Sequence, residues 1–284
     1  MNRTILLTFI SYLFFFGLKA QNTEWQTSLE DGFKLGMEEN KNVLVEFGVM
    51  QDEVPLFISD EAWSDEVIVN KLSDFIPVSV DLTNQLDLAN KYEVIFSPTI
   101  MLFTPKGELV FRTYGNYSVF ELDDILSSLQ NNVRKICQLK TVFSDEDALG
   151  NLLLLEEYLK ASIKAPEFIE SDFTDMASNA LENLKSLELD FDPVQEQRLK
   201  ILENLLEQIQ YPNSSSLRKF YKIGKKGLLA SNHSLLLFAI SHGEYLDGDK
   251  EKSEAVYQEL RKRLLDDKQA ADFCAILEST FDFQ

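Results

Sequence analysis

The chain is poor in the residues that most often carry metal or thiol chemistry. Its 284 residues include only two cysteines and two histidines, His233 and His242. This excludes multi-histidine metal sites and disfavours most histidine-based catalytic pairs. Eleven glycines and seven prolines are too few for a fibrous or low-complexity chain. The remaining composition, 45% hydrophobic, is globular and long enough for one large domain or two ordinary ones.

Basic residues are also scarce. The 27 lysines and arginines are outnumbered by 47 aspartates and glutamates, which gives a net charge of −20. The longest basic cluster, Lys222 to Lys226, holds three lysines, so we expect no basic patch. An acidic chain repels phosphate backbones and anionic membrane surfaces unless a basic patch overrides its field. We therefore expect no nucleic-acid partner.

The first twenty residues have the pattern of a targeting segment. Arg3 precedes an apolar run over residues 5–18, and the small residue Ala20 follows. This is typical of a secretory signal peptide. The alternative, an uncleaved membrane anchor, needs about 20 apolar residues, more than this run supplies. We expect residues 1–20 to be removed and the mature chain, with no membrane span, to be exported to a periplasm or secreted.

The two cysteines, Cys137 and Cys274, are too far apart for a Cys-x-x-Cys motif or a zinc knuckle. In an exported protein they have two alternative states, a long-range disulfide or two buried, inert thiols. Their apolar and mixed-charge neighbours do not indicate a catalytic thiol. We expect no metal site and no cofactor.

Residues 21–135 alternate between helical and strand patterns. Strands are expected at 43–47, 75–81, 99–103 and 108–114, and helices at 25–40, 64–72, 86–92 and 120–133. This alternation, ending in a hairpin and a helix, indicates an α/β sandwich around a small mixed sheet.

Residues 136–284 have helical periodicity only. Helices are expected at 145–163, 166–189, 193–209, 217–230, 235–246, 250–265 and 268–281. Short polar joints between them favour antiparallel neighbours. The predicted fold class is therefore α/β + all-α, with a helical bundle or a short tetratricopeptide-like solenoid as the second part.

Residues 24–130 carry an ordered set of short motifs. They are Trp25 with Ser28-Leu29-Glu30, the strand Val43–Phe47, Ser64–Val67, Val78–Asp81, Ala89–Val94, Ser97-Pro98-Thr99 and Pro105-x-Gly107. In this order and spacing they resemble the thioredoxin superfamily, in particular its secreted and periplasmic branch. The resemblance implies a thioredoxin-like fold for this part of the chain.

The chain departs from that family at the site of its redox chemistry. Counted from Phe47, the family's Cys-x-x-Cys falls on Asp52, Glu53, Val54 and Pro55. Thiol–disulfide exchange needs a thiolate and a resolving thiol, and this turn has neither. We expect a helix to begin here, with Asp52 as its N-cap and the acids near its positive end. A cation site at Asp52 and Glu53 is the alternative.

The motif around Pro98, by contrast, matches the pattern of the family that the chain resembles. The resemblance implies that Pro98 is cis and that residues 96–98 expose a backbone edge. Phe96, Ser97, Pro98 and Thr99 form a candidate edge for a peptide that binds by strand addition. The alternative is that Pro98 only shapes the fold. Met50, Val54, Phe57 and Trp63 nearby are candidates for apolar surface, but for each of them a place in the core is the favoured alternative.

These features favour an exported, redox-inactive, thioredoxin-like protein that binds protein or peptide segments as a chaperone-like holder or adaptor. A thiol–disulfide oxidoreductase is one alternative, and a structural accessory subunit of an envelope complex is another. Without its cysteine pair, the chain is not expected to be an enzyme.

Overall fold

The structure is a computed structural model that describes residues 24–51, 54–144, 146–188, 190–212 and 214–281. The predicted signal peptide lies outside these ranges. No helix within them is long and apolar enough to cross a membrane.

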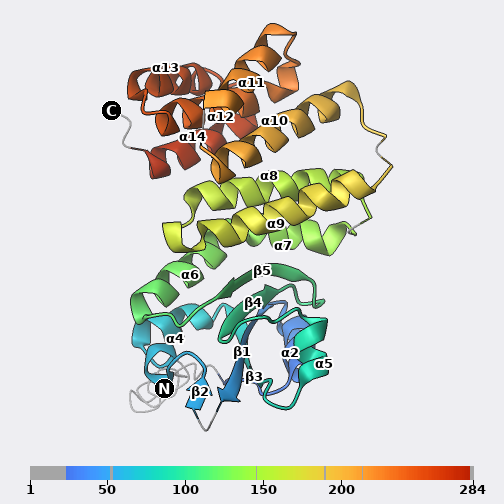
Figure 1. Ribbon diagram of the computed structural model, residues 1–284, viewed down its shortest axis with the longest axis vertical. Helices are drawn as coiled ribbons and strands as arrows, with labels where there is room; N and C mark the ends of the chain where they lie inside the picture. The colour runs from blue at the N-terminus through green and yellow to red at the C-terminus, as the bar shows by residue number, and fades with distance from the viewer. Residues whose placement is uncertain (1–23, 52–53, 145, 189, 213, 282–284) are drawn as a thin grey trace, which may run out of the picture.

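A four-stranded mixed sheet with a short added hairpin forms the first part of the molecule (Figure 1). Its order is β3-β1-β4-β5, and β1 pairs parallel with β3 and antiparallel with β4. The fifth strand, β2, pairs with the end of β1. The strands are β1 (Asn42–Gln51), β2 (Val54–Leu56), β3 (Phe75–Asp81), β4 (Thr99–Phe103) and β5 (Leu109–Tyr114). The predictions for β3 and β4 are confirmed residue for residue.

Helices cover both faces of this sheet. They are α2 (Leu29–Glu39), α3 (Asp60–Trp63), α4 (Glu66–Leu72), α5 (Leu86–Lys91) and α6 (Val119–Asn132). Apolar residues of α2 and α5 pack on one face, and those of α4 and α6 pack on the other. Asp65 caps α4, so this helix begins two residues after the predicted start at residue 64, and Ser118 and Glu121 form a capping box on α6.

The second part is helical throughout its described residues. It contains α7 (Arg134–Val142), α8 (Ala148–Lys164), α9 (Glu167–Ser186), α10 (Pro193–Gln210), α11 (Ser214–Lys225), the short η1 (Ala230–Asn232), α12 (His233–Leu246), α13 (Lys250–Arg261) and α14 (Lys268–Thr280). Helix α7 was not expected, and the predicted boundary between residues 135 and 136 falls inside it. The predicted fold class is confirmed.

One apolar core joins the two parts. The outer face of β5 packs directly on α9, where the Phe111 and Phe173 rings lie 4.7 Å apart. The buried Tyr158 of α8 donates its hydroxyl hydrogen to the Val110 carbonyl oxygen at 2.8 Å. Since the same cluster of buried residues continues to Phe281, the helical part covers a sheet face and does not stand apart from it.

Buried charges further connect the helices. Glu156 and Glu157 of α8 are both buried, and Arg198 of α10 pairs with Glu156 at 2.5 Å. Lys160 pairs with Glu157 at 2.7 Å, and Lys135 of α7 reaches the same carboxylate at 2.5 Å. Glu156, Glu157 and Lys160 therefore each have a partner of opposite charge, which offsets the cost of their burial.

Both tryptophans of the chain, Trp25 and Trp63, lie in the first part with ring centroids 5.0 Å apart. Their fluorescence therefore reports on the sheet part alone, while helical circular dichroism is dominated by the second part.

We predict that Phe173→Ala lowers the unfolding free energy by about 3–5 kcal/mol. In urea titrations both signals should shift together, because the core is shared.

Phe168→Ala, on the same helix but at a part-exposed position, is the matched control and should cost less than about 1 kcal/mol. A Phe173→Ala transition that moves in circular dichroism but not in tryptophan fluorescence would show that the two parts unfold independently.

Candidate functional site

The turn expected to carry a degenerate redox site is a β-hairpin. Strand β1 runs on to Gln51 and β2 returns antiparallel, with Gln51 opposite Val54 and Val49 opposite Leu56. The expected helix start is therefore wrong. Asp52 and Glu53 lie outside the described residues. The physical reason lies in Pro55, since a residue that precedes proline is disfavoured in the α region and Val54 is also β-branched.

The first helix after this turn begins later, at Asp60, and Ser59 caps it.

A buried carboxylate lies on β1 before the hairpin. It belongs to Glu46, which is only 4% exposed. Its Oε1 accepts a hydrogen bond from the Ile58 N–H at 2.7 Å. Burial raises the pKa of Glu46 to about 7, and this hydrogen bond offsets only part of the effect.

The Ser97–Pro98 peptide bond is cis, as the resemblance implied. The four predicted edge residues are not equivalent. Pro98 and Thr99 are buried, the Pro98 carbonyl accepts from the Gly115 N–H, and Thr99 pairs with Phe47 and Tyr114. Phe96 is exposed and Ser97 is half-buried, so only these two of the four can meet a partner.

Ser97 lies between the hairpin and solvent. Its hydroxyl donates to the Leu56 carbonyl oxygen at 2.7 Å, which holds the hairpin beside the loop that enters β4. Within the described ranges, neither the backbone N–H nor the backbone C=O of Ser97 makes a hydrogen bond. The Phe96 carbonyl, by contrast, accepts from the Thr99 hydroxyl at 2.6 Å. Toward β4 the free backbone edge therefore ends at Ser97, because Pro98 and Thr99 are already paired.

Large apolar side chains surround Ser97. Ile95 is 79% exposed and Phe96 is 55% exposed, and the Phe96 ring stacks on Tyr114 with centroids 4.8 Å apart. We call this exposed group the cis-proline surface; its members are Leu86, Ile95, Phe96 and Tyr114, which line two cavities that share Ile95 and Phe96. Exposed apolar patches are frequent at interaction sites.

A cavity of about 410 Å³ opens within this surface, between the hairpin, α5 and the loop before Pro98. Val49, Leu86, Ile95 and Phe96 line it. Thr83 fixes one wall, because its hydroxyl accepts a hydrogen bond from the Met50 N–H at 2.8 Å. The cavity is of a size that accepts an apolar side chain.

The sequence identified Met50, Val54 and Phe96 as candidates for the surface, and all three are exposed. For Phe57 and Trp63, the structure agrees with the core alternative rather than with a surface role. Trp63 is buried, and the Phe57 ring packs over Gly48, where a Cβ atom would lie 2.3 Å from it. Leu86, Ile95 and Tyr114 were missed, although two large apolar residues directly before Ser97 were a usable signal.

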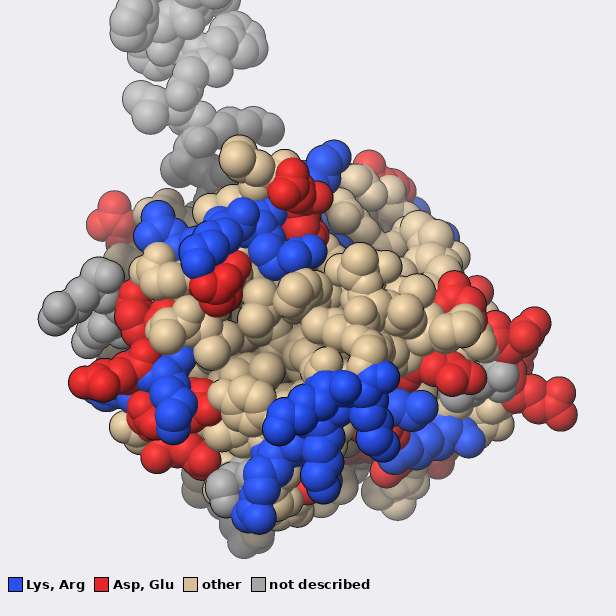
Figure 2. All heavy atoms as spheres, turned by 90° about the horizontal axis from the view of Figure 1, so that it is seen from above, with Lys and Arg blue, Asp and Glu red and all other residues tan. Residues whose placement is uncertain are grey.

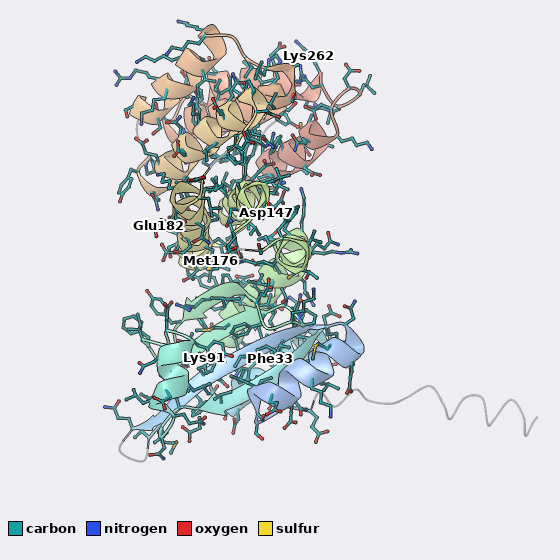
Figure 3. All side chains as sticks on the ribbon, turned by 90° about the vertical axis from the view of Figure 1, so that its right-hand side faces the viewer. Phe33, Lys91, Asp147, Met176, Glu182 and Lys262 are labelled. Carbon is teal, nitrogen blue, oxygen red and sulfur yellow. The ribbon has the colours of Figure 1, made fainter. Side chains whose placement is uncertain are left out.

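An acidic cleft of about 460 Å³ adjoins the cis-proline surface, between β5 and α9. Phe96 and Tyr114 line it from the sheet side, and Asp172, Asp175 and Met176 line it from α9. Figure 3 labels Met176 at the lower side of the helical part, next to the sheet. Burial raises the pKa of Asp172 to about 6, and the nearby Asp175 adds to this rise.

One basic residue, Arg112, also lines this cleft, but its guanidinium group already has hydrogen-bond and ion-pair partners. Arg112 donates from Nη2 to the Tyr92 carbonyl oxygen at 2.8 Å and pairs with Glu93 at 3.6 Å. The cleft therefore keeps the negative charge of its two α9 aspartates. No sequence pattern placed these residues near Pro98, because α9 reaches the sheet only through tertiary packing.

Both cysteines are free and buried, so the disulfide alternative is not what the structure contains. Burial raises the pKa of each thiol to about 11. Asn42 donates from Nδ2 to the Cys137 sulfur at 3.2 Å. Neither thiol lines the cis-proline surface or its two cavities. No cluster of His, Cys, Asp or Glu suited to a metal ion occurs within the described ranges.

No protein-family description matches this chain, and no curated protein matches it. Among solved structures it is similar to the solution structure of a thioredoxin from Thermus thermophilus, with 18% identity and a TM-score of 0.35. That match covers 40% of this chain and 92% of the other. The strand order and pairing, together with the helices on both faces, give residues 24–132 a thioredoxin-like fold.

Glu46 should make the fold less stable as the pH rises. Below pH 4.5 its carboxyl is protonated in both states. Between pH 4.5 and about 7 only the unfolded chain ionises there, so stability falls; above about 7 the loss is constant. The total loss of unfolding free energy between these pH values is about 3 kcal/mol. Glu46→Gln keeps an acceptor for Ile58, so its unfolding free energy in urea should fall by about 3 kcal/mol less than that of the parent protein between pH 4.5 and 8. Asp172, whose pKa is raised to about 6, contributes to both profiles alike. Parallel profiles of variant and parent would contradict the prediction.

The two thiols should be protected in the native protein. We predict that an aromatic disulfide reagent titrates neither Cys137 nor Cys274 rapidly at neutral pH, since raised pKa values and burial leave little accessible thiolate. Both should react in denaturant without prior reduction. A fast-reacting native thiol, or a requirement for reduction before either reacts, would contradict the structure.

Proposed function

We propose that this protein is an exported, redox-inactive, thioredoxin-like binding protein that holds extended segments of other proteins at the cis-proline surface. The observation that carries the proposal is the exposure of Ile95, Phe96 and Leu86 around a side-chain-sized cavity next to Ser97. Export is supported by Arg3 and the apolar run that follows it.

Binding would combine one backbone contact with apolar anchoring. A partner segment in extended conformation can pair with the free N–H and C=O of Ser97. Because side chains of an extended segment alternate, one can enter the cavity beside Phe96 while the next points away. Strand addition does not extend past Ser97 into β4, because Pro98 and Thr99 are already paired.

Charge favours a basic residue in the partner. The cleft beside Tyr114 presents Asp172 and Asp175, and the aromatic pair Phe96–Tyr114 forms its neighbouring wall. A lysine or arginine side chain there gains charge attraction and contact with a ring face. The preferred segment is therefore extended and apolar with a base nearby.

Thiol exchange is not part of the proposal. The hairpin at the end of β1 replaces the family's cysteine turn, and the remaining thiols are buried away from the cis-proline surface. Fold alone does not carry an activity whose reacting groups are missing. The contact with a partner is consequently non-covalent and reversible.

We predict that Phe96→Ser weakens binding to a permanently unfolded, carboxymethylated test protein about 5- to 30-fold, measured by fluorescence anisotropy. This is the range expected when an anchoring aromatic is removed from an interface. Phe120→Ser is the matched control, since Phe120 is 73% exposed on α6 and lies outside the cis-proline surface.

Both variants should unfold at nearly the same urea concentration as the parent protein, because both rings are largely exposed. Equal loss of affinity in the two variants, or no loss in Phe96→Ser, would place the binding surface elsewhere. No measurable binding by the parent protein would remove the proposal itself.

A further inference from the structure

Charge is divided unevenly along this molecule. Residues 24–132 hold 20 acidic and 6 basic side chains, so the thioredoxin-like part is strongly negative. Residues 214–226, at the other end of the molecule, hold five bases and no acid. Figure 2 looks down on that end and shows a dense group of Lys and Arg side chains over α11. The expectation from sequence that no basic patch exists is therefore wrong.

Helical spacing produces this patch. Arg218, Lys222 and Lys225 are four and three residues apart, so they share one face of α11. Lys219 and Lys226 flank them, and we call these five residues the α11 patch. The expectation considered only the three lysines at 222–226, although Arg218 and Lys219 lie just before them in the sequence.

Neighbouring acids do not cancel the α11 patch. Glu207 of α10 pairs with Lys219, and Glu244 of α12 accepts a hydrogen bond from Tyr221. Lys222, Lys225 and Lys226 make no ion pair within the described part of the chain. Since charges are screened over about 8 Å at physiological salt, the distant acids of the sheet part do not govern the field here.

The surface around the α11 patch suits a flat, anionic interface. Between two groups of bases the end face in Figure 2 is largely uncharged, and acids lie mostly toward its margins. Lys262, labelled at the top of Figure 3, belongs to this end, and Leu265 three residues later is 96% exposed. The exposed ring of Tyr221 has the amphipathic character of residues found at lipid headgroups.

We propose that the α11 patch docks the protein on a membrane surface of anionic phospholipid. Helix α11 lies on the surface without inserting, because Leu217 and Phe220 on its apolar face are buried in the helical part. The acidic thioredoxin-like part is repelled from the same surface, so the molecule stands upright and presents the cis-proline surface away from the lipid. This inference does not depend on the proposed function.

The test is co-sedimentation of the full chain with vesicles of phosphatidylcholine, with or without phosphatidylglycerol. The protein should bind only the anionic vesicles and dissociate at high salt. Lys222→Gln, Lys225→Gln and Lys226→Gln combined should lower the partition coefficient at least about tenfold, since each base near an anionic surface contributes about fivefold.

The control combines Lys34→Gln, Lys91→Gln and Lys106→Gln, three exposed lysines of the sheet part, and changes net charge equally. It should leave vesicle binding unchanged. Equal loss in both triple variants, or no binding to anionic vesicles by the parent protein, would overturn the proposal. Salt-sensitive self-association without lipid, lost in the α11 variant, would assign the patch to the acidic part of a second copy instead.

Discussion

The packing of the helical part on the outer face of β5 determines which surfaces of this molecule are available. Phe173 lies against Phe111, and the Tyr158 hydroxyl binds the Val110 carbonyl, so this region of the sheet is closed. Helices α2 and α5 close the opposite face. The end of the sheet at Ser97 stays open, and it is there that large apolar side chains are exposed.

At the same end of the sheet the chain has a hairpin, and it lacks the cysteine pair of the family that the sequence resembles. A hairpin extends β1 beyond the point where a cysteine-bearing helix would begin in the family that the sequence resembles. Ser97 ties the hairpin to the loop before β4, and the resulting cavity is lined by apolar side chains. In the function proposed above, this cavity takes an apolar side chain of an extended segment, and the two acids of α9 nearby favour a base.

Local patterns predicted much of this arrangement. The apolar runs at 75–81 and 99–103 form strands over those residues, and Pro98 is cis. The prediction failed at 54–55, where register counting placed a helix although the bond before Pro55 favours extended backbone. Tertiary packing was beyond its reach, since Asp172 reaches the site only because α9 lies on β5. The α11 patch was missed for a simpler reason: only residues 222–226 were considered, although the five bases lie within residues 218–226.

The central claim is that a partner segment binds at the cis-proline surface. Hydrogen exchange of the full chain, measured with and without a bound unfolded test protein, addresses it most directly. The account predicts slower exchange in peptides covering residues 94–98 and 49–56, with little change in α12 to α14. Protection confined to the helical part, with residues 94–98 unaffected, would contradict it.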